Sequence, residues 1–124
     1  MAVVLVVDDS LLARHTVRLA LRGQHEVLEA SDGIAGLLVA RACMPDVVIA
    51  AKELPATSGE ALLRALEREG HGVPGILIET PGSEACGGES RLIRVHRPLS
   101  AKGIRGAVER ALAAREYGAA KRAA

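Results

Sequence analysis

The chain has 124 residues, a length that fits one domain whose core needs no disulfide bonds to hold it. Apolar residues make up 49% and charged residues 25%, which excludes a disordered tail and is typical of a globular protein. The formal net charge of +1 lacks the basic excess that nucleic-acid-binding proteins carry. The single aromatic residue, Tyr117, excludes stacking platforms for bases or sugars.

The first apolar run, Val3–Val7, is not preceded by a basic segment and is too short for a signal peptide or a membrane span. We therefore expect a cytoplasmic protein without membrane contact. The two cysteines cannot form a disulfide framework and lack the spacing of a zinc site. We interpret Cys43 as a small buried thiol and Cys86 as a loop thiol.

Short apolar runs alternate with amphipathic stretches along the chain, and this alternation predicts strands and helices in turn. The predicted strands are Val3–Val7, His25–Ala30, Asp46–Ala51, Gly75–Ile78 and a weaker edge strand, Arg91–Val95. The predicted helices run from the cap Ser10 to about Arg22, from the residue after the turn Ser31–Gly33 to about Cys43, from Gly59 to Glu69 after the cap Ser58, and onward from the cap Ser100.

This order of elements predicts a single doubly wound α/β domain, a parallel sheet with helices on both faces. Between the last two strands, Thr80–Ser90 holds three glycines and a proline, so we expect a loop there and a fourth helix that is short or missing. We assign the domain to residues 1–113. Residues 114–124 are either the end of the last helix or a tail or linker.

Functional groups in an open parallel sheet gather at the carboxyl ends of its strands. In this chain those ends are Asp8-Asp9, Ala51-Lys52-Glu53, Glu79-Thr80 and His96-Arg97. The two aspartates could bind magnesium, which prefers carboxylate oxygens. They could equally cap the first helix and pair with Lys52 or Arg97. The residues alone leave both interpretations open.

A set of short motifs in register resembles the receiver (CheY-like) domain of bacterial two-component response regulators, to about Ala113. The motifs are Val6–Ser10, Arg14, Glu26-Val27, Ala30–Gly33, Pro45–Ile49, Pro55, Gly59 and Arg97-Pro98. The resemblance implies a flavodoxin-like, five-stranded sheet of order 2-1-3-4-5. It also implies a non-enzymatic part in two-component or phosphorelay-type signalling, with a protein partner in a bacterial pathway.

The departures from this family fall at its reactive positions. An aspartate at the end of the third strand accepts a phosphoryl group in the family, and the aligned residue is Ala51, which has no oxygen with which to attack phosphorus. The two switch positions, a Thr or Ser and an aromatic residue, align with Glu79 and Arg94. The lysine before proline aligns with Arg97, which keeps the charge and not the compact ammonium group.

We therefore expect a remnant pocket without a catalytic residue. Its members are Asp8, Asp9, Ala51, Lys52, Glu53, Glu79 and Arg97. We expect no cofactor and weak or absent magnesium binding, with Asp8 and Asp9 as the residual candidates. The expected arrangement is one ionic cluster in which Arg97 offsets the charge of Asp8, Asp9 and Glu79, with Lys52 as a further candidate.

The leading hypothesis for function is a phosphorylation-independent receiver domain that docks a protein partner and not nucleic acid. The alternatives are a conventional magnesium-dependent phosphoacceptor and a regulatory fragment of a larger response regulator. For the partner surface we consider Arg91 and Arg94 on one side, or Arg14 and Arg18 as part of an exposed basic row on the first helix. A homodimer is a further option.

Overall fold

The structure is a computed structural model that describes residues 1–82 and 92–123, with side chains as far as residue 115. Its strands are β1 (Val3–Val7), β2 (Glu26–Ala30), β3 (Val47–Ala51), β4 (Gly75–Glu79) and β5 (Ile93–His96). Its helices are α1 (Leu11–Leu21), α2 (Gly33–Cys43), α3 (Gly59–Arg68) and α4 (Ala101–Ala123). These elements lie within a few residues of the predicted ones.

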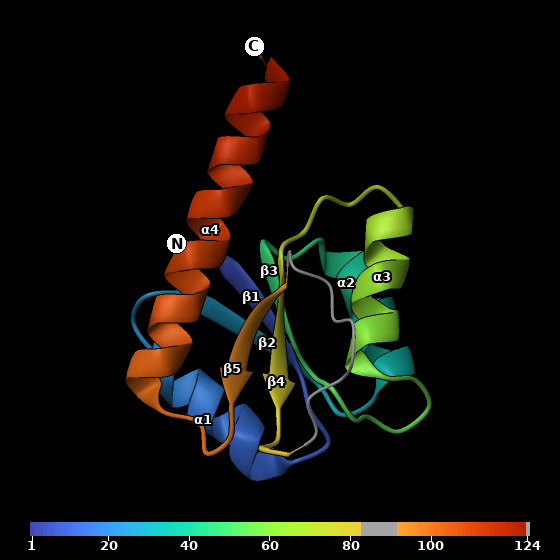
Figure 1. Cartoon of the computed structure of the whole chain (residues 1–124), viewed down its shortest axis with the longest axis vertical. Coiled ribbons are helices and arrows are strands. Elements are labelled where there is room, and N and C mark those ends of the chain that lie inside the picture. Colours follow the sequence, from blue (N-terminus) through green and yellow to red (C-terminus); the bar gives the residue numbers. More distant parts are fainter. Residues whose placement is uncertain (83–91, 124) are drawn as a thin grey trace.

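The five strands form one parallel sheet in the order β2-β1-β3-β4-β5, which confirms the predicted flavodoxin-like topology (Figure 1). The central strand β3 is buried along its whole length, and β1 is buried after its first residue. Continuous runs of valine, isoleucine and alanine fit this position because both faces of a parallel sheet are covered. The edge strand β5 is only partly buried, which fits the edge position predicted for a strand that carries Arg94.

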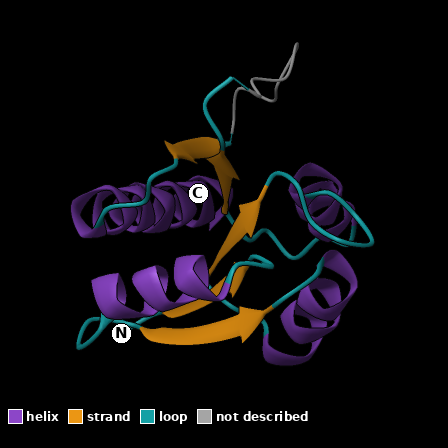
Figure 2. Cartoon of the chain, turned by 90° about the horizontal axis from the view of Figure 1, so that it is seen from below, coloured by secondary structure: helices purple, strands orange, loops and turns teal. Residues whose placement is uncertain are grey.

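Helices cover both faces of the sheet, α1 and α4 on one side and α2 and α3 on the other (Figure 2). Each side has its own apolar core, built from alternate residues of the strands. The first core includes Val6, Val17, Ile49, Ile76 and Ile104. The second includes Leu5, Val48, Leu62, Leu66 and Leu77. Aliphatic side chains therefore fill the interior without any help from aromatic rings.

Three helices begin directly after short loops, and each start is capped by a side chain. Ser10, Asp32 and Ser58 accept hydrogen bonds from backbone amides of the first helical turn at 3.1, 2.7 and 3.1 Å. The start of α3 also lies very close to the end of β3, because a Cβ built on Gly59 would lie 2.1 Å from the carbonyl oxygen of Ala51. Only glycine allows α3 to begin so close to the end of β3.

The last helix continues beyond the expected domain end at Ala113, and its C-terminal part projects past the sheet (Figure 1). Most of the segment in which we expected a loop, together with Arg91 and Cys86, falls in residues 83–91, outside the described residues. The prediction for Cys43 is wrong, because this thiol is exposed at the end of α2. No helix among the described residues is long and apolar enough to cross a membrane.

Candidate functional site

The loops that follow β1, β3, β4 and β5 meet at the carboxyl edge of the sheet and enclose a cavity of about 390 Å³. Four residues of the predicted pocket line it, together with three further residues. The predicted four are Asp9, Lys52, Glu53 and Arg97, and the others are Ser10, Ile78 and Thr80. Asp8, Ala51 and Glu79 are buried at the ends of β1, β3 and β4. The strand order thus places all seven predicted pocket residues at one edge.

Asp8 is fully buried and both of its carboxylate oxygens are hydrogen-bonded. The backbone amide of Ser10 donates to Oδ1 at 2.9 Å, and Arg97 Nη2 donates to Oδ2 at 2.8 Å. Arg97 is held in place by its own backbone amide, which donates to the Glu79 carbonyl at 2.9 Å. The predicted pairing of Arg97 with Asp8 is therefore present, and Asp9 is exposed beside it.

Glu79 lies among three basic side chains although it is only 2% exposed. Arg94 Nη1 donates to its Oε2 at 2.9 Å, Lys52 Nζ lies 3.9 Å from the same oxygen, and His96 Nε2 lies 3.5 Å from Oε1. The sheet register pairs Glu79 with His96, which puts Arg94 diagonally across on the same face. These contacts neutralise a carboxylate that would be costly to bury alone.

The single cluster that we expected from the sequence is wrong in its connections. Arg97 pairs with Asp8, while Glu79 is held by Arg94 and Lys52. Sequence reasoning placed Arg94 on a partner surface and missed its contact with Glu79. The opposite charges of Glu79 and Arg94, on two strands predicted to be adjacent, were the available signal. Opposite charges across adjacent strands stabilise each other.

These residues do not fit a magnesium ion. Ala51, at the end of β3, is 1% exposed and offers only a methyl group. Both oxygens of Asp8 already accept hydrogen bonds, and one of them faces the positive guanidinium of Arg97. In the described part of the chain no three His, Cys, Asp or Glu side chains are grouped to hold a metal. A hard cation needs several free oxygen ligands, and this arrangement does not supply them.

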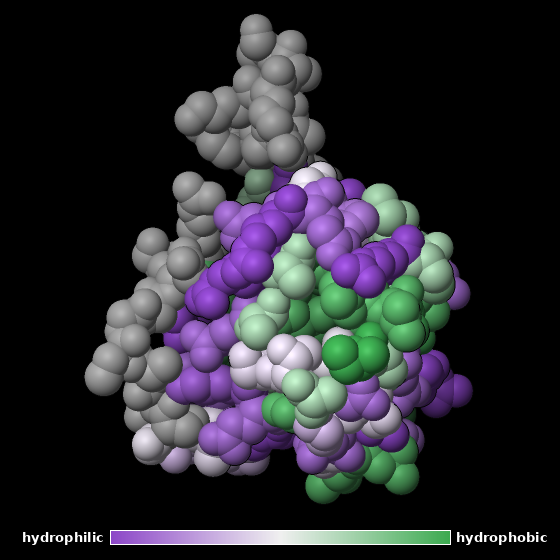
Figure 3. All heavy atoms as spheres, turned by 90° about the vertical axis from the view of Figure 1, so that its right-hand side faces the viewer, coloured by the Kyte–Doolittle hydropathy of each residue, from purple (hydrophilic) through white to green (hydrophobic). Residues whose placement is uncertain are grey.

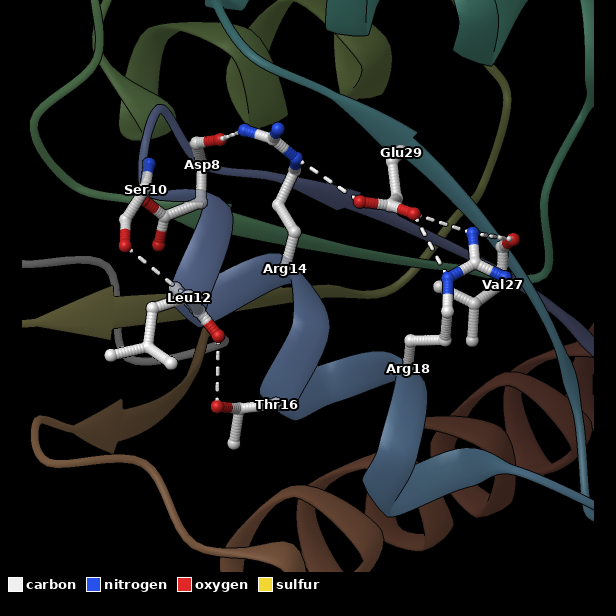
Figure 4. A network of polar contacts seen from close by, with 9 residues as sticks. Asp8, Ser10, Leu12, Arg14, Thr16, Arg18, Val27 and Glu29 are labelled. Carbon is white, nitrogen blue, oxygen red and sulfur yellow. Dashed lines mark hydrogen bonds and ion pairs between the residues drawn. The ribbon is translucent and has the colours of Figure 1, made fainter.

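A second network supports the loop after β1 from the side of α1 and β2 (Figure 4). Arg14 donates to the Asp8 carbonyl at 2.7 Å and to Glu29 at 3.1 Å, and Arg18 Nε donates to Glu29 at 2.9 Å. The hydrogen bond from Arg18, aided by Arg14, lowers the pKa of Glu29. The prediction of an exposed basic row is therefore wrong for Arg14, which is 17% exposed and pairs with Glu29.

Comparison with known proteins reveals one curated relative and many structural neighbours. No protein-family model matches the chain. The probable transcriptional regulatory protein TcrX of Mycobacterium tuberculosis is 38% identical over 76 residues, which cover 60% of this chain and 32% of the relative. The matched part thus spans about a third of that protein.

Solved structures match the fold over nearly the whole chain. The chemotaxis response regulator CheY4 of Vibrio cholerae aligns with a TM-score of 0.80 at 24% identity, covering 90% of this chain and 99% of CheY4. A response regulator receiver domain from Clostridium thermocellum aligns with a TM-score of 0.84 at 22% identity, covering 94% and 98%. The chain has the receiver fold. In this receiver fold, the cavity at the carboxyl edge of the sheet is therefore the candidate functional site.

Proposed function

We propose that this chain is a receiver domain of two-component-type signalling that acts without phosphorylation, by binding a protein partner. The observation that carries the proposal is Ala51. It stands at the end of β3, where receivers have the phosphoacceptor aspartate, and its buried methyl group has no nucleophilic atom. Without an acceptor, a phosphoryl group cannot bias the domain between two conformations.

The charges around Ala51 support the same proposal. Glu79 occupies the position at which receivers have a small hydroxyl residue, and its carboxylate would repel the oxygens of a phosphoryl group. Arg94 and Lys52 neutralise Glu79, and Arg97 neutralises Asp8. Each buried carboxylate therefore has a partner from this chain, so neither needs a metal ion to balance its charge.

The alternative of a conventional phosphoacceptor requires another carboxylate near the cavity. Asp46 is the acidic residue that directly precedes β3, and it lies at the opposite end of that strand from the cavity. Its oxygens are engaged there, accepting from the Val3 amide at 2.8 Å and from Arg115 at 2.7 Å. Asp46 is therefore no substitute for the missing acceptor.

The test is incubation of the protein with acetyl phosphate and magnesium, followed by mass spectrometry of the intact chain. We expect no change in mass. A gain of about 80 Da, the mass of an added phosphoryl group, would overturn the proposal. Ala51→Asp alone is expected to stay unmodified because Glu79 is unchanged, whereas Ala51→Asp with Glu79→Thr restores both groups and serves as the positive control.

Magnesium binding is tested separately by NMR. Millimolar magnesium is expected to leave the amide resonances of Asp8, Asp9 and Ser10 in place, because Arg97 holds the Asp8 carboxylate. Saturable shifts of these three amides would contradict this part of the proposal. Arg97→Met is the informative variant, since it removes the guanidinium that competes with the metal.

A further inference from the structure

Helix α2 is apolar on its outer side as well as on the side that faces the sheet. Its sequence, GIAGLLVARAC, contains a single charged residue, Arg41. Ile34 and Leu38 are 52% and 59% exposed, and Met44, directly after the helix, is 56% exposed. Figure 3 looks onto the α2 and α3 side of the molecule and shows an apolar patch beside hydrophilic side chains. A helix that is apolar all round is normally buried on every side.

The fully covered positions of α2 hold its smallest residues. The buried residues of this helix are Gly33, Gly36 and Ala40. A Cβ built on Gly36 would lie 2.8 Å from a methyl group of Val7 on β1, so the helix backbone lies close against the sheet. The large side chains of Ile34 and Leu38 are on the exposed side instead. This distribution is the reverse of that in a helix that packs on a sheet and faces water.

Ile34, Leu38 and Ala42 form one row along the exposed side of α2, because residues four apart lie on the same face of a helix. We call this row the α2 stripe. Arg41 beside it donates from Nη2 to Glu69 Oε2 at 2.6 Å and from Nε to Oε1 at 3.1 Å. The stripe is uncharged, and the one cation of the helix is neutralised by α3. A lipid surface fits poorly, because helices that lie on membranes carry Lys and Arg along their polar face.

We propose that the α2 stripe is the contact between two copies of this chain, which pack their α2 helices antiparallel about a twofold axis at Leu38. An uncharged stripe can face itself without repulsion, and most homo-oligomers close through such a self-complementary patch. The register sets Ile34 of one copy against the partner's Ala42, a large side chain against a small one. It also brings Arg41, in the last turn of one helix, toward the partner's Asp32, the acidic cap of the other.

A contact confined to this stripe makes a weak dimer. Two helices of 11 residues, each about 16 Å long, bury less surface than the roughly 800 Å² per partner of a standard interface. We therefore expect association at concentrations of about 0.1 mM and above. The inference goes beyond the proposed function and is independent of it, because none of the three stripe residues lines the cavity at the carboxyl edge.

Sedimentation velocity at increasing protein concentration tests the dimer. The average mass is expected to rise from 12.9 kDa toward twice that value. NMR spectra over the same series are expected to show concentration-dependent shifts of the amides of Ile34, Leu38 and Ala42. A chain that stays monomeric up to about 1 mM, or shifts confined to α1 or α4, would overturn the proposal and leave the proposed function untouched.

A charge placed on the axis separates the α2 stripe from other exposed leucines. Leu38→Glu sets two carboxylates against each other and is expected to weaken self-association roughly tenfold or more. The thermal midpoint should stay unchanged, because Leu38 is exposed and glutamate favours a helix. The matched control, Leu19→Glu, makes the same change at a 52% exposed position of α1 and is expected to dimerise like wild type. Equal losses in the two variants would contradict a contact at α2.

The twofold axis makes a prediction that no other occupant of the stripe shares. Leu38→Glu and Leu38→Lys are each expected to be monomeric alone, whereas an equimolar mixture should associate, because opposite charges then meet on the axis. A mixture that stays monomeric would overturn the proposal. Binding of wild type to phosphatidylcholine vesicles, lost in Leu38→Glu, would identify lipid as the occupant of the stripe and would also overturn it.

Discussion

Glu79 and Glu29 each lie beside two or more basic side chains, in very different surroundings. Glu79, at the carboxyl edge, is 2% exposed and is held by Arg94 and Lys52. Glu29, on the edge strand β2, is 29% exposed and is held by Arg14 and Arg18. Water can replace a lost partner at Glu29 and not at Glu79, so the same chemistry has unequal energetic weight at the two positions.

The two sets of ion pairs also differ in the part of the molecule that they hold in place. The ion pairs around Glu29 secure α1 and the loop after β1 from the outside, and each can be exchanged for water at small cost. The pairs around Glu79 and Asp8 are set into the interior, where an unmatched charge is strongly unfavourable. A buried carboxylate at position 79 therefore requires cations like those at Arg94 and Lys52. Glu79, Arg94 and Lys52 thus form one physical unit.

The largest expected effect comes from removal of the closest cation at Glu79. Arg94→Leu leaves a buried carboxylate whose basic neighbours among the described residues are Lys52 and His96, and we expect the free energy of unfolding to fall by about 3 kcal/mol. Urea unfolding followed by circular dichroism measures this change. The double variant Arg94→Leu with Glu79→Leu is expected to recover much of the loss, because it removes the unpaired charge. A double variant that is less stable than Arg94→Leu would contradict this explanation.

The matched variant at the exposed network has a much smaller expected effect. Arg18→Leu leaves Glu29 in contact with Arg14 and with water, so we expect a loss of only about 0.5 kcal/mol in the same urea experiment. The comparison between the two glutamates fails if this loss equals or exceeds that of Arg94→Leu. Repeating both measurements at high salt makes the comparison between the two glutamates sharper. Screening is expected to reduce the stability loss of Arg18→Leu more than that of Arg94→Leu.

Much of the fold could be predicted from the sequence because its determinants are local. The buried strands are uninterrupted apolar runs, and Ser10 and Ser58 cap their helices as their positions predict. The placement of the pocket residues followed from the strand order, since the carboxyl ends of parallel strands share one edge. These features need no knowledge of side-chain conformation.

The connections within the pocket could not be predicted in the same way. Whether Arg97 reaches Asp8 or Glu79 depends on the sheet register and on the rotamer of a long side chain, and neither is encoded in a short motif. The exposure of Cys43 was missed for a similar reason. Cys43 is the last residue of an apolar helix, and the sequence does not show which face of that helix meets the sheet.

The smallest expected effect is a pH dependence at a third glutamate, Glu69, at the end of α3. Hydrogen bonds from Arg41 at 2.6 Å, and then from His71, lower the pKa of Glu69 from 4.5 to about 2. A lowered pKa means that the ionised carboxylate stabilises the folded state above pH 4.5 and that this contribution is lost as the pH falls toward 2. Glu69→Gln should therefore be slightly less stable than wild type near neutral pH.

Urea unfolding of wild type and Glu69→Gln across this pH range measures how much the ionised Glu69 carboxylate stabilises the fold. The two stabilities are expected to converge between pH 4.5 and about 2, in the window set by the pKa shift. The same pair of chains in an Arg41→Leu background should show little convergence, because Arg41 is the main cause of that shift. A gap that widens in acid would show that Glu69 stabilises the fold through something other than its charge.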